Sequence, residues 1–557
     1  MRQDGTSGTA AQHGPEAETK PEPLTPTTGT PPTNPSSPAS PSSPTAGVLT
    51  LARTEARRLL LHPALLASLV LCVGLWVYDT VFGPAAYPVL HDEARFLQVQ
   101  LLLPAAGTFL AVHLAVLRPA RDGTDAWFEA LVLEPWQRVA AHLLAVLPVA
   151  GAVAVLAGAR ITWLALLPGA VSAPAAAELA TGPAAVLLAG VLAVLVATLI
   201  RSVAAGPITL GILGIATVVG ALFPFSGRRW WGLIAIEDEM RDLLPSGLAH
   251  RPAGLHVLYL VLLAVGLGAA ALLRSGLRGR TVTAVVALAL AGALTAGAAQ
   301  SRPEPGAVTA AGERAVNSPS GEQRCVRRES VTYCAFPEYL DRHRQWSEVV
   351  DGILRWVPDE AKERRYTVRQ HIVSLVKSGG LAQITIPVDN WAADDRRAGT
   401  EGAVVAGSAW GNDGDYANDA TIGFAAAFAQ HVTAAGRAPN TTGTSTRVCG
   451  GQSLVTLWLA AQATPETASA LRSRMSRSFG GAVGFGTLTT VDAERGDAEA
   501  VLRLLERPTE ETGARIKRSW NELTDPATTS QQAAQLLGIS APAPEQGAGE
   551  DALCAGN

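Results

Sequence analysis

Long apolar segments alternate with short arginine-containing connections between Leu60 and Ala299. Each segment has roughly 17 to 25 residues, about the number that a helix needs to cross the hydrocarbon core of a membrane. The segments are 64–83, 98–117, 141–159, 184–200, 206–224, 254–274 and 281–299. This pattern predicts a polytopic α-helical membrane protein with about seven transmembrane helices.

The polarity pattern changes after Gln300. A linker at 301–317 precedes a region of mixed polarity at 318–545, and a polar tail follows at 546–557. Apolar spacing within this region predicts helices at Tyr339–Trp356, Gly450–Ala461, Thr464–Arg477 and Asp492–Leu505, and short strands at Leu381–Val388 and Ala403–Ala406. We therefore expect a mixed α+β domain after the last predicted span.

Two segments precede the first predicted span. Residues 1–46 are dominated by Pro, Ser, Thr, Gly and Ala, a composition typical of a disordered tail, and they show no cleavable signal peptide. Residues 47–63 mix leucines with Arg53, Arg57 and Arg58, which predicts an amphipathic helix lying at the membrane interface. The alternative is a helix that simply extends the first span.

Arginines near the ends of the predicted spans indicate the orientation in the membrane. They cluster before the first span, after the second, after the fourth and before the seventh, which all lie on one side. By the positive-inside rule that side is cytoplasmic. We therefore expect a protein of the cell membrane whose N-terminus lies on the cytoplasmic side and whose C-terminal domain is extracytoplasmic. The connection between the fifth and sixth spans disagrees, because Arg228, Arg229, Arg241 and Arg251 fall on the predicted outer side. A net charge of −4 gives no basic face for a nucleic-acid partner.

Four of the five cysteines lie in the predicted outer domain. Cys325 and Cys334 are nine residues apart, and Cys449 and Cys554 form the second candidate pair. An oxidising compartment permits both disulfides, and the first would contribute on the order of 2–3 kcal/mol by restricting the unfolded chain. Buried free thiols are the alternative. Cys72 lies inside the first predicted span and is expected to be a small core residue.

Few residues suggest chemistry of their own. The chain has no HExxH motif, no G-x-S-x-G motif and no GxxxxGK[ST] phosphate loop, so we expect no catalytic site, metal site or cofactor in this chain. The acidic segment Asn412–Asp419 fits a polar loop better than a calcium site. His113 and His142 lie in or beside predicted spans, where a proton or substrate role competes with hydrogen bonding between helices.

The connection between the second and third spans has a distinctive order of residues. Arg121-Asp-Gly-Thr-Asp125 precedes a short helix with an aromatic face at Trp127 and Phe128, and Pro135 is expected to end that helix. This motif, in this position after an interfacial helix, resembles the cytoplasmic coupling helix of ABC-2 type transporter permeases. The resemblance covers about residues 48–275, with the coupling helix at about 122–134. A seventh span at 276–300 and the outer domain resemble additions found in some actinobacterial members.

The resemblance implies that the six-span region 64–275 is a permease that works with a separate ABC ATPase subunit, where the ATP binds. The residues implied to contact that subunit are Asp122, Gly123, Thr124, Asp125, Trp127, Phe128 and Glu129. It also implies a homodimer or heterodimer of permeases, in contact with membrane lipid, and no enzymatic activity in this chain. The apolar walls favour a hydrophobic or amphipathic cargo, and we expect an exporter. The alternative function is a membrane-anchored extracytoplasmic enzyme or sensor whose activity lies in the C-terminal domain.

Overall fold

The structure is a computed structural model of the 557-residue chain. It describes residues 44–82, 87–124, 133–222, 231–234, 245–248, 251–302, 306–378, 381–411, 420–435, 441–442, 444–478, 481–486 and 488–541. Most of the predicted tail at 1–46 lies outside these residues, but its last three residues open the first helix. The connection between the fifth and sixth predicted spans also falls largely outside them.

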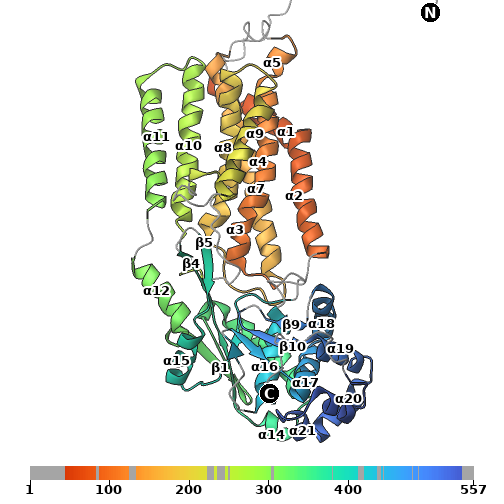
Figure 1. The fold of residues 1–557 in the computed structure, drawn as a ribbon. Helices are drawn as coiled ribbons and strands as arrows, with labels where there is room; N and C mark the ends of the chain where they lie inside the picture. The colour runs from red at the N-terminus through yellow and green to blue at the C-terminus, as the bar shows by residue number, and fades with distance from the viewer. Residues whose placement is uncertain are drawn as a thin grey trace, which may run out of the picture. The chain divides into compact units, whose positions relative to one another are not determined.

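The N-terminal half of the described chain is a helical bundle (Figure 1). Its helices are α1 (Pro44–Leu60), α2 (Pro63–Phe82), α3 (Leu90–Gln100), α4 (Leu102–Val116), α5 (Arg118–Arg121), α7 (Pro135–Ala165), α8 (Ala176–Leu199), α9 (Ala205–Leu222), α10 (Ala253–Arg274) and α11 (Arg280–Gln300). The predicted interfacial helix is α1, and α3 and α4 together form the second predicted span. Several helices begin well before the apolar segments that predicted them.

Six helices of the described chain, and not about seven, have the length and apolar composition needed to cross a membrane. They are Pro63–Val81, Leu90–Val116, Pro135–Ala165, Ala176–Leu199, Ala253–Arg274 and Arg280–Gln300. The predicted span 206–224 corresponds to α9, whose described apolar part, Ala205–Thr217, falls among the shorter apolar helices. The fold is therefore that of a polytopic helical membrane protein with six such helices.

Helix α9 nevertheless starts at one end of the bundle, and the chain after it resumes at the other. Just before α9, the backbone oxygen of Ser202 lies 3.1 Å from Nε2 of His113, near the end of α4. Just before α10, Arg251 contacts Glu178 at the start of α8. Since α4 ends where α8 ends, and α8 starts at the opposite end, Ser202 and Arg251 lie at opposite ends of the bundle.

Small residues let these helices approach closely. A Cβ atom on Gly190 of α8 would lie 2.5 Å from Cγ1 of Val146 in α7. A Cβ atom on Gly266 of α10 would lie 2.8 Å from Cδ2 of Leu290 in α11. Close approach through small residues is how helices associate in a membrane, where burying apolar side chains gives little driving force. The glycines therefore fix the α7–α8 and α10–α11 contacts.

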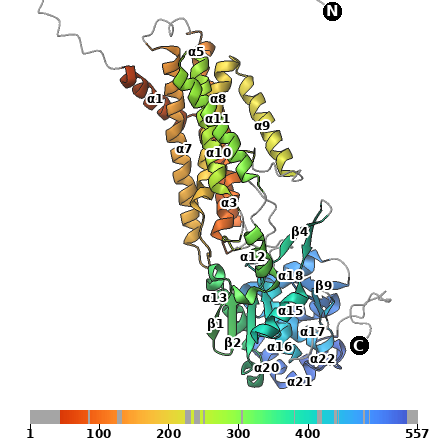
Figure 2. The same cartoon turned by 90° about the vertical axis from the view of Figure 1, so that its left-hand side faces the viewer.

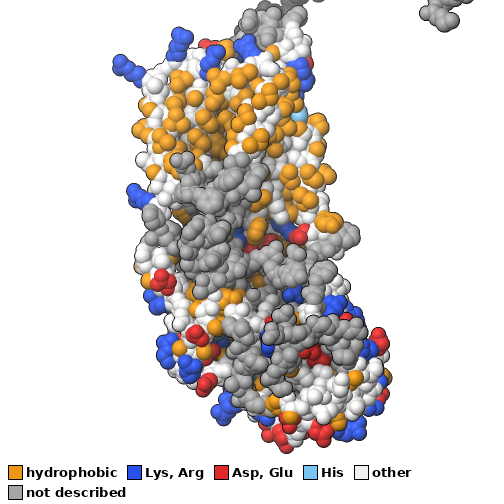
Figure 3. All heavy atoms as spheres, viewed as in Figure 1, with side chains coloured by type: hydrophobic (Ala, Val, Ile, Leu, Met, Phe, Trp, Pro, Cys, Tyr) orange, Lys and Arg blue, Asp and Glu red, His pale blue; other side chains and the backbone are white. Residues whose placement is uncertain are grey.

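The bundle surface carries apolar side chains where a soluble protein would carry polar ones. Exposed fractions reach 70% for Val70, 74% for Val155 and 73% for Leu288. Figure 3 shows hydrophobic side chains gathered over the bundle, with Lys and Arg at the end where α5 lies. This surface suits lipid as its solvent.

The C-terminal region is a separate assembly of helices and strands (Figure 2). It begins with α12 (Gly306–Asn317), which occupies most of the predicted linker. The helical elements that follow are η2 (Pro319–Gly321), η3 (Pro337–Arg342), α13 (His343–Leu354), α14 (Asp359–Lys362), α15 (Val388–Ala398), α16 (Ala420–Ala434), α17 (Gly450–Ala461), α18 (Pro465–Arg477), α19 (Arg495–Leu504), α20 (Thr509–Arg518), α21 (Trp520–Leu523) and α22 (Ser530–Leu537). The strands are β1 (Arg324–Arg328), β2 (Val331–Ala335), β3 (Tyr366–Gln370), β4 (Ser374–Ser378), β5 (Leu381–Thr385), β6 (Val404–Ala406), β7 (Thr441–Thr442), β8 (Ser445–Arg447), β9 (Ala482–Phe485) and β10 (Thr490–Glu494).

The described strands form two four-stranded sheets and a hairpin. One sheet has the order β1-β2-β3-β6, with β2, β3 and β6 parallel and β1 antiparallel to β2. The other has the order β7-β8-β10-β9, and β4 pairs with β5 alone. The prediction of a mixed α+β domain is consistent with this topology.

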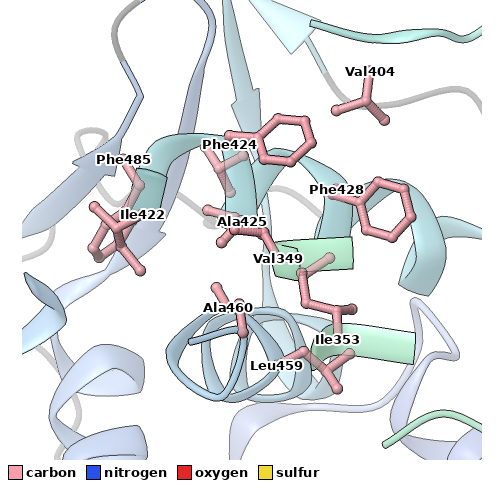
Figure 4. Packing of buried hydrophobic residues seen from close by; sticks show 14 of the residues in the cluster. Val349, Ile353, Val404, Ile422, Phe424, Ala425, Phe428, Leu459, Ala460 and Phe485 are labelled. Carbon is pink, nitrogen blue, oxygen red and sulfur yellow. The ribbon is translucent and has the colours of Figure 1, made fainter. Parts of the chain in front are cut away.

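Helix α16 lies in the centre of the C-terminal core. Phe424 and Phe428 project from it among residues of other elements, including Val349 and Ile353 of α13 and Leu459 of α17 (Figure 4). Phe428 and Val350 have no exposed surface, and Trp346 and Trp458 are equally buried in the same cluster. Burial of such large side chains supplies most of the free energy that holds a domain of this kind together.

Candidate functional site

The end of the bundle that carries α5 holds a buried carboxylate. Glu55 of α1 is 4% exposed, and its Oε1 accepts hydrogen bonds from Nη1 of Arg58 at 3.0 Å and from Nη1 of Arg118 at 3.3 Å. Helix α1 also packs along α7, with Ala52, Ala56 and Leu59 buried. The pair of arginines compensates the charge of the carboxylate. Glu55 thereby links the interfacial helix to the connection that begins at Arg118.

The predicted contact residues in this connection are described only in part. Asp122 accepts a hydrogen bond from Nε of Arg121 at 3.2 Å, and Gly123 adopts a left-handed φ of 67°. The amide of Thr124 donates to the backbone oxygen of Pro119 at 3.0 Å. Asp125, Trp127, Phe128 and Glu129 lie outside the described residues. The described part is therefore a turn after α5.

Pro135 was predicted to end a short helix, and in the structure it starts the next one. The predicted short helix before it lies largely outside the described residues. Pro135 is the first residue of the 31-residue α7. Glu134 and Gln137 form a capping box, with the Glu134 amide donating to Oε1 of Gln137 at 2.9 Å. Proline is favoured at the first helical position because its missing N–H would have no partner there. The third spanning helix consequently begins six residues before the predicted apolar segment.

The two candidate histidines lie in spanning helices. His113 of α4 has no exposed surface, stacks on Phe109, and approaches the Ser202 oxygen through Nε2. A Cβ on Gly206 would lie 2.6 Å from its ring, so glycine is required for this approach. His113 thus has the interhelical contact of a structural histidine. His142 is in α7, partly buried.

The sequence analysis missed a layer of polar side chains at the other end of the bundle. Glu178 of α8 accepts a hydrogen bond from Nε of Arg251 at 2.7 Å and one from Nε2 of Gln98 of α3 at 2.5 Å. The exposed fractions are 5% for Glu178 and 2% for Gln98, and the Arg251 side chain is 10% exposed. Three chain segments therefore meet at one buried carboxylate. A charge buried this deeply requires such partners.

Further polar contacts lie on α2, α3 and α7. Arg95 pairs with Asp92 within α3, Arg160 lies 3.5 Å from Asp79, and Nε1 of Trp76 donates to Oε1 of Gln100 at 2.5 Å. Asp92, Arg95 and Arg160, like Glu178, lie just outside the apolar segments used for prediction, although the helices continue through them. A search that extended each span by two helical turns would have found them. The bundle is therefore less uniformly apolar inside than the sequence analysis expected.

Glu338 of η3 connects the C-terminal region to two connections of the bundle and to the first turn of α3. Its carboxylate accepts hydrogen bonds from the hydroxyl of Ser172 and from the Ser246 amide at 2.7 Å, and it lies 3.3 Å from Nδ1 of His91. Partial burial raises the pKa of Glu338, but the hydrogen bonds from His91, Ser172 and Ser246 outweigh that effect and lower it to about 2. The carboxylate is therefore ionised at all ordinary pH values.

Arg342, one turn further along η3, has no exposed surface. Its Nη1 donates to the backbone oxygen of Gly169 at 2.7 Å, and its Nη2 donates to that of Tyr87 at 2.8 Å. The guanidinium also lies over the Tyr87 ring, at 5.6 Å from its centre. Burial lowers the pKa of Arg342 to about 10. Two backbone carbonyls and an aromatic ring therefore solvate this buried cation.

The cysteine predictions are confirmed in part. Cys325 and Cys334 form a disulfide across the β1–β2 pair, where they lie directly opposite each other. Cys449 is also disulfide-bonded, while its predicted partner Cys554 lies outside the described residues. Cys72 is a buried free thiol in α2, as expected for a core residue.

A small cavity lies in the C-terminal region beside α16. It is lined in part by Trp410, Phe424, Gly486 and Leu488, and its volume of about 20 Å³ holds about one water molecule. The acidic segment 412–419 lies outside the described residues. Within the described chain, no group of three His, Cys, Asp or Glu side chains could hold a metal ion.

No protein-family model, curated protein or solved structure matches the chain. Its function must therefore be inferred from its own residues.

Proposed function

We propose that this chain is the membrane-spanning permease subunit of an ABC transporter, and that a separate nucleotide-binding subunit hydrolyses the ATP. The proposed site is the connection between the second and third spans, at residues 118–134. Its described part, α5 and the turn at Asp122–Thr124, protrudes at the end of the bundle where α1 lies. A partner subunit can reach the motif that resembles a coupling helix at this end.

One observation carries the proposal. Glu55 of the interfacial helix α1 contacts Arg118, the first residue of this connection. The same helix packs on α7, the helix that follows the connection. A push on the connection would therefore move α1, α4 and α7 together. That mechanical link is what a permease needs when its ATPase lies on one side and its cargo passes between the spans.

The same geometry supports an orientation in the membrane. Arginines concentrate at the α5 end of the bundle, as Figure 3 also shows, which makes this end cytoplasmic under the positive-inside rule. Glu338 and Arg342 contact connections at the opposite end, so the C-terminal region is extracytoplasmic in this proposal. The Cys325–Cys334 disulfide agrees with an oxidising compartment. The cargo class that fits the apolar bundle is hydrophobic or amphipathic, and export is the proposed direction.

The experiment is purification of the full chain from native membranes in mild detergent, followed by a search for an associated ATPase. We expect a nucleotide-binding subunit to co-purify and to be lost from the Trp127→Ala, Phe128→Ala double variant. Trp163→Ala is the matched control, because this aromatic residue is 52% exposed near the opposite end of α7. Equal recovery of the ATPase with the double variant would refute the assigned contact. A chain that purifies without any ATPase would favour an enzyme or sensor function of the C-terminal region.

A further inference from the structure

The contacts of Glu338 and Arg342 converge on one short segment. Both residues belong to η3, the 3-10 helix Pro337–Arg342. Between them they bind the connection before α3 (Tyr87) with the first turn of α3 itself (His91), the connection before α8 (Gly169 and Ser172) and the connection before α10 (Ser246). One segment of the C-terminal region thus holds three connections that lie far apart in the sequence.

The helices that follow these connections are the ones that meet in the polar layer. Gln98 belongs to α3, Glu178 belongs to α8, and Arg251 lies two residues before α10. The η3 contacts therefore fasten the starts of these three helices, and the Gln98–Glu178–Arg251 contacts join the same helices about two turns further along α3. If the helix ends separate, both sets of contacts must break.

Apolar packing reinforces this junction. Val89 and Val171 form an isolated parallel bridge between two of the connections, and both belong to the core cluster of the C-terminal region. Leu248 of the third connection packs against the same cluster. A Cβ atom on Gly169 would lie 2.3 Å from the Tyr87 ring, which shows how tightly the two connections approach each other under Arg342.

We propose that the C-terminal region is a latch that closes its end of the helical bundle. Glu338 and Arg342 are its positioning residues: they hold the starts of α3, α8 and α10 together and keep the polar layer beneath them out of contact with water. Opening the bundle at this end requires η3 to release all three connections. The latch acts on the chain itself, so it does not depend on the identity of the ATPase or the cargo.

Thr181 offers a reporter of opening. It has no exposed surface and lies three residues beyond Glu178 in α8, beneath the polar layer. The experiment uses the full chain in lipid nanodiscs with Cys72→Ser and Thr181→Cys, and it measures the rate of reaction with a membrane-impermeant maleimide. We expect at least a tenfold faster reaction when Glu338→Ala and Arg342→Met are added. An unchanged rate would overturn the latch.

A second reporter separates release from unfolding. Thr456 of α17 has no exposed surface in the core of the C-terminal region. With Thr456→Cys in place of the bundle reporter, the latch variants should react as slowly as the parent chain. If both reporters react quickly, the milder Glu338→Gln variant distinguishes release of η3 from unfolding of the C-terminal region. It keeps the side-chain size and loses the charge that faces His91, and a parental rate at Thr181→Cys in that variant would refute the proposal.

A matched control tests whether any ion pair of the C-terminal region has this effect. Arg495 and Glu499 of α19 form a partly exposed pair at 3.1 Å. Replacement of both, as Arg495→Met with Glu499→Ala, should leave the reaction rate of Thr181→Cys unchanged. A rise equal to that of the latch variants would show that general loosening, rather than release of η3, exposes the bundle.

Discussion

The helical bundle and the C-terminal region bury their apolar residues in opposite ways. In the bundle, Val70, Val155 and Leu288 are more than two-thirds exposed. In the described part of the C-terminal region, no large hydrophobic residue is exposed to that extent, and the large aromatic residues Trp346, Phe428 and Trp458 have no exposed surface. The difference teaches that each region folds against its own solvent. Lipid accepts apolar side chains on the outside, whereas water drives them into a core.

Ion pairs vary in burial within both regions, and the C-terminal region also has a buried pair, Arg369 with Asp395. In the bundle, Glu178 and Arg251 are almost fully buried and pair with each other. In the C-terminal region, Arg495 and Glu499 pair at a partly exposed position, as Figure 3 illustrates more generally by the charges of both signs on that region. A buried pair is costly to break because one charge is left without compensation, and an exposed pair is worth little.

The largest expected effect separates the two kinds of apolar residue. Phe428→Ala should reduce the free energy of unfolding of the C-terminal region by about 4 kcal/mol, because it removes a fully buried ring from the centre of the core. Val155→Ala on the bundle surface should change the stability of the bundle by less than about 0.5 kcal/mol. Denaturant unfolding of the full chain in nanodiscs, followed by protease resistance of each region, measures both. Similar effects at the two sites would contradict the comparison.

A somewhat smaller effect is expected at the buried ion pair. Arg251→Met should destabilise the bundle by about 3 kcal/mol, since Glu178 then loses its cation while it stays buried. Adding Glu178→Gln should recover most of that loss. The measurement is SDS-induced unfolding in mixed micelles. Arg495→Met at the exposed pair is the control, with an expected change below about 0.5 kcal/mol. A double variant no more stable than Arg251→Met would show that the pair is not the cause.

The smallest effect concerns pH. Burial raises the pKa of Asp497, in α19, to about 6 from 3.8. Between these values the folded chain keeps a proton that the unfolded chain has lost, so stability falls as pH rises through this window and is level above it. Asp497→Asn avoids that loss, and should therefore gain roughly 2 kcal/mol over the parent between pH 4 and pH 7. Thermal unfolding at both pH values measures the gain.

The control for this prediction is Asp359→Asn, whose parent side chain is 89% exposed. It should change stability by less than about 0.5 kcal/mol at either pH. If Asp497→Asn gives the same difference from the parent at pH 4 and pH 7, the buried carboxyl does not control the pH dependence.

The sequence by itself determined the apolar segments, the change in character after Gln300 and the Cys325–Cys334 pair. These follow from local properties: the length of an apolar run sets whether a helix can cross a membrane, and two cysteines close in sequence need only a short turn between paired strands. The helix Gly450–Ala461 was predicted with its observed bounds, because its apolar spacing is also a local property of the sequence. The count of spanning helices was too high, because the apolar run at 206–224 does not yield a described helix of sufficient apolar length.

Two helix predictions were only partly correct because a helical period can cover two different elements. Tyr339–Trp356 includes the end of η3 before α13, and Asp492–Leu505 includes part of strand β10 before α19. In each case the first residues pair or pack with other segments, as Asp492 does with strands β8 and β9. Apolar spacing carries no record of such partners.

Only the tertiary structure decided the polar layer and the junction beneath η3. Glu178 and Arg251 are 73 residues apart, and Arg342 binds the oxygen of Tyr87 across 255 residues. No periodicity or short motif connects residues so distant in sequence. Their meeting depends on helices that continue beyond their apolar segments and bring polar ends together, where buried charges must find partners because neither lipid nor water is available to solvate them.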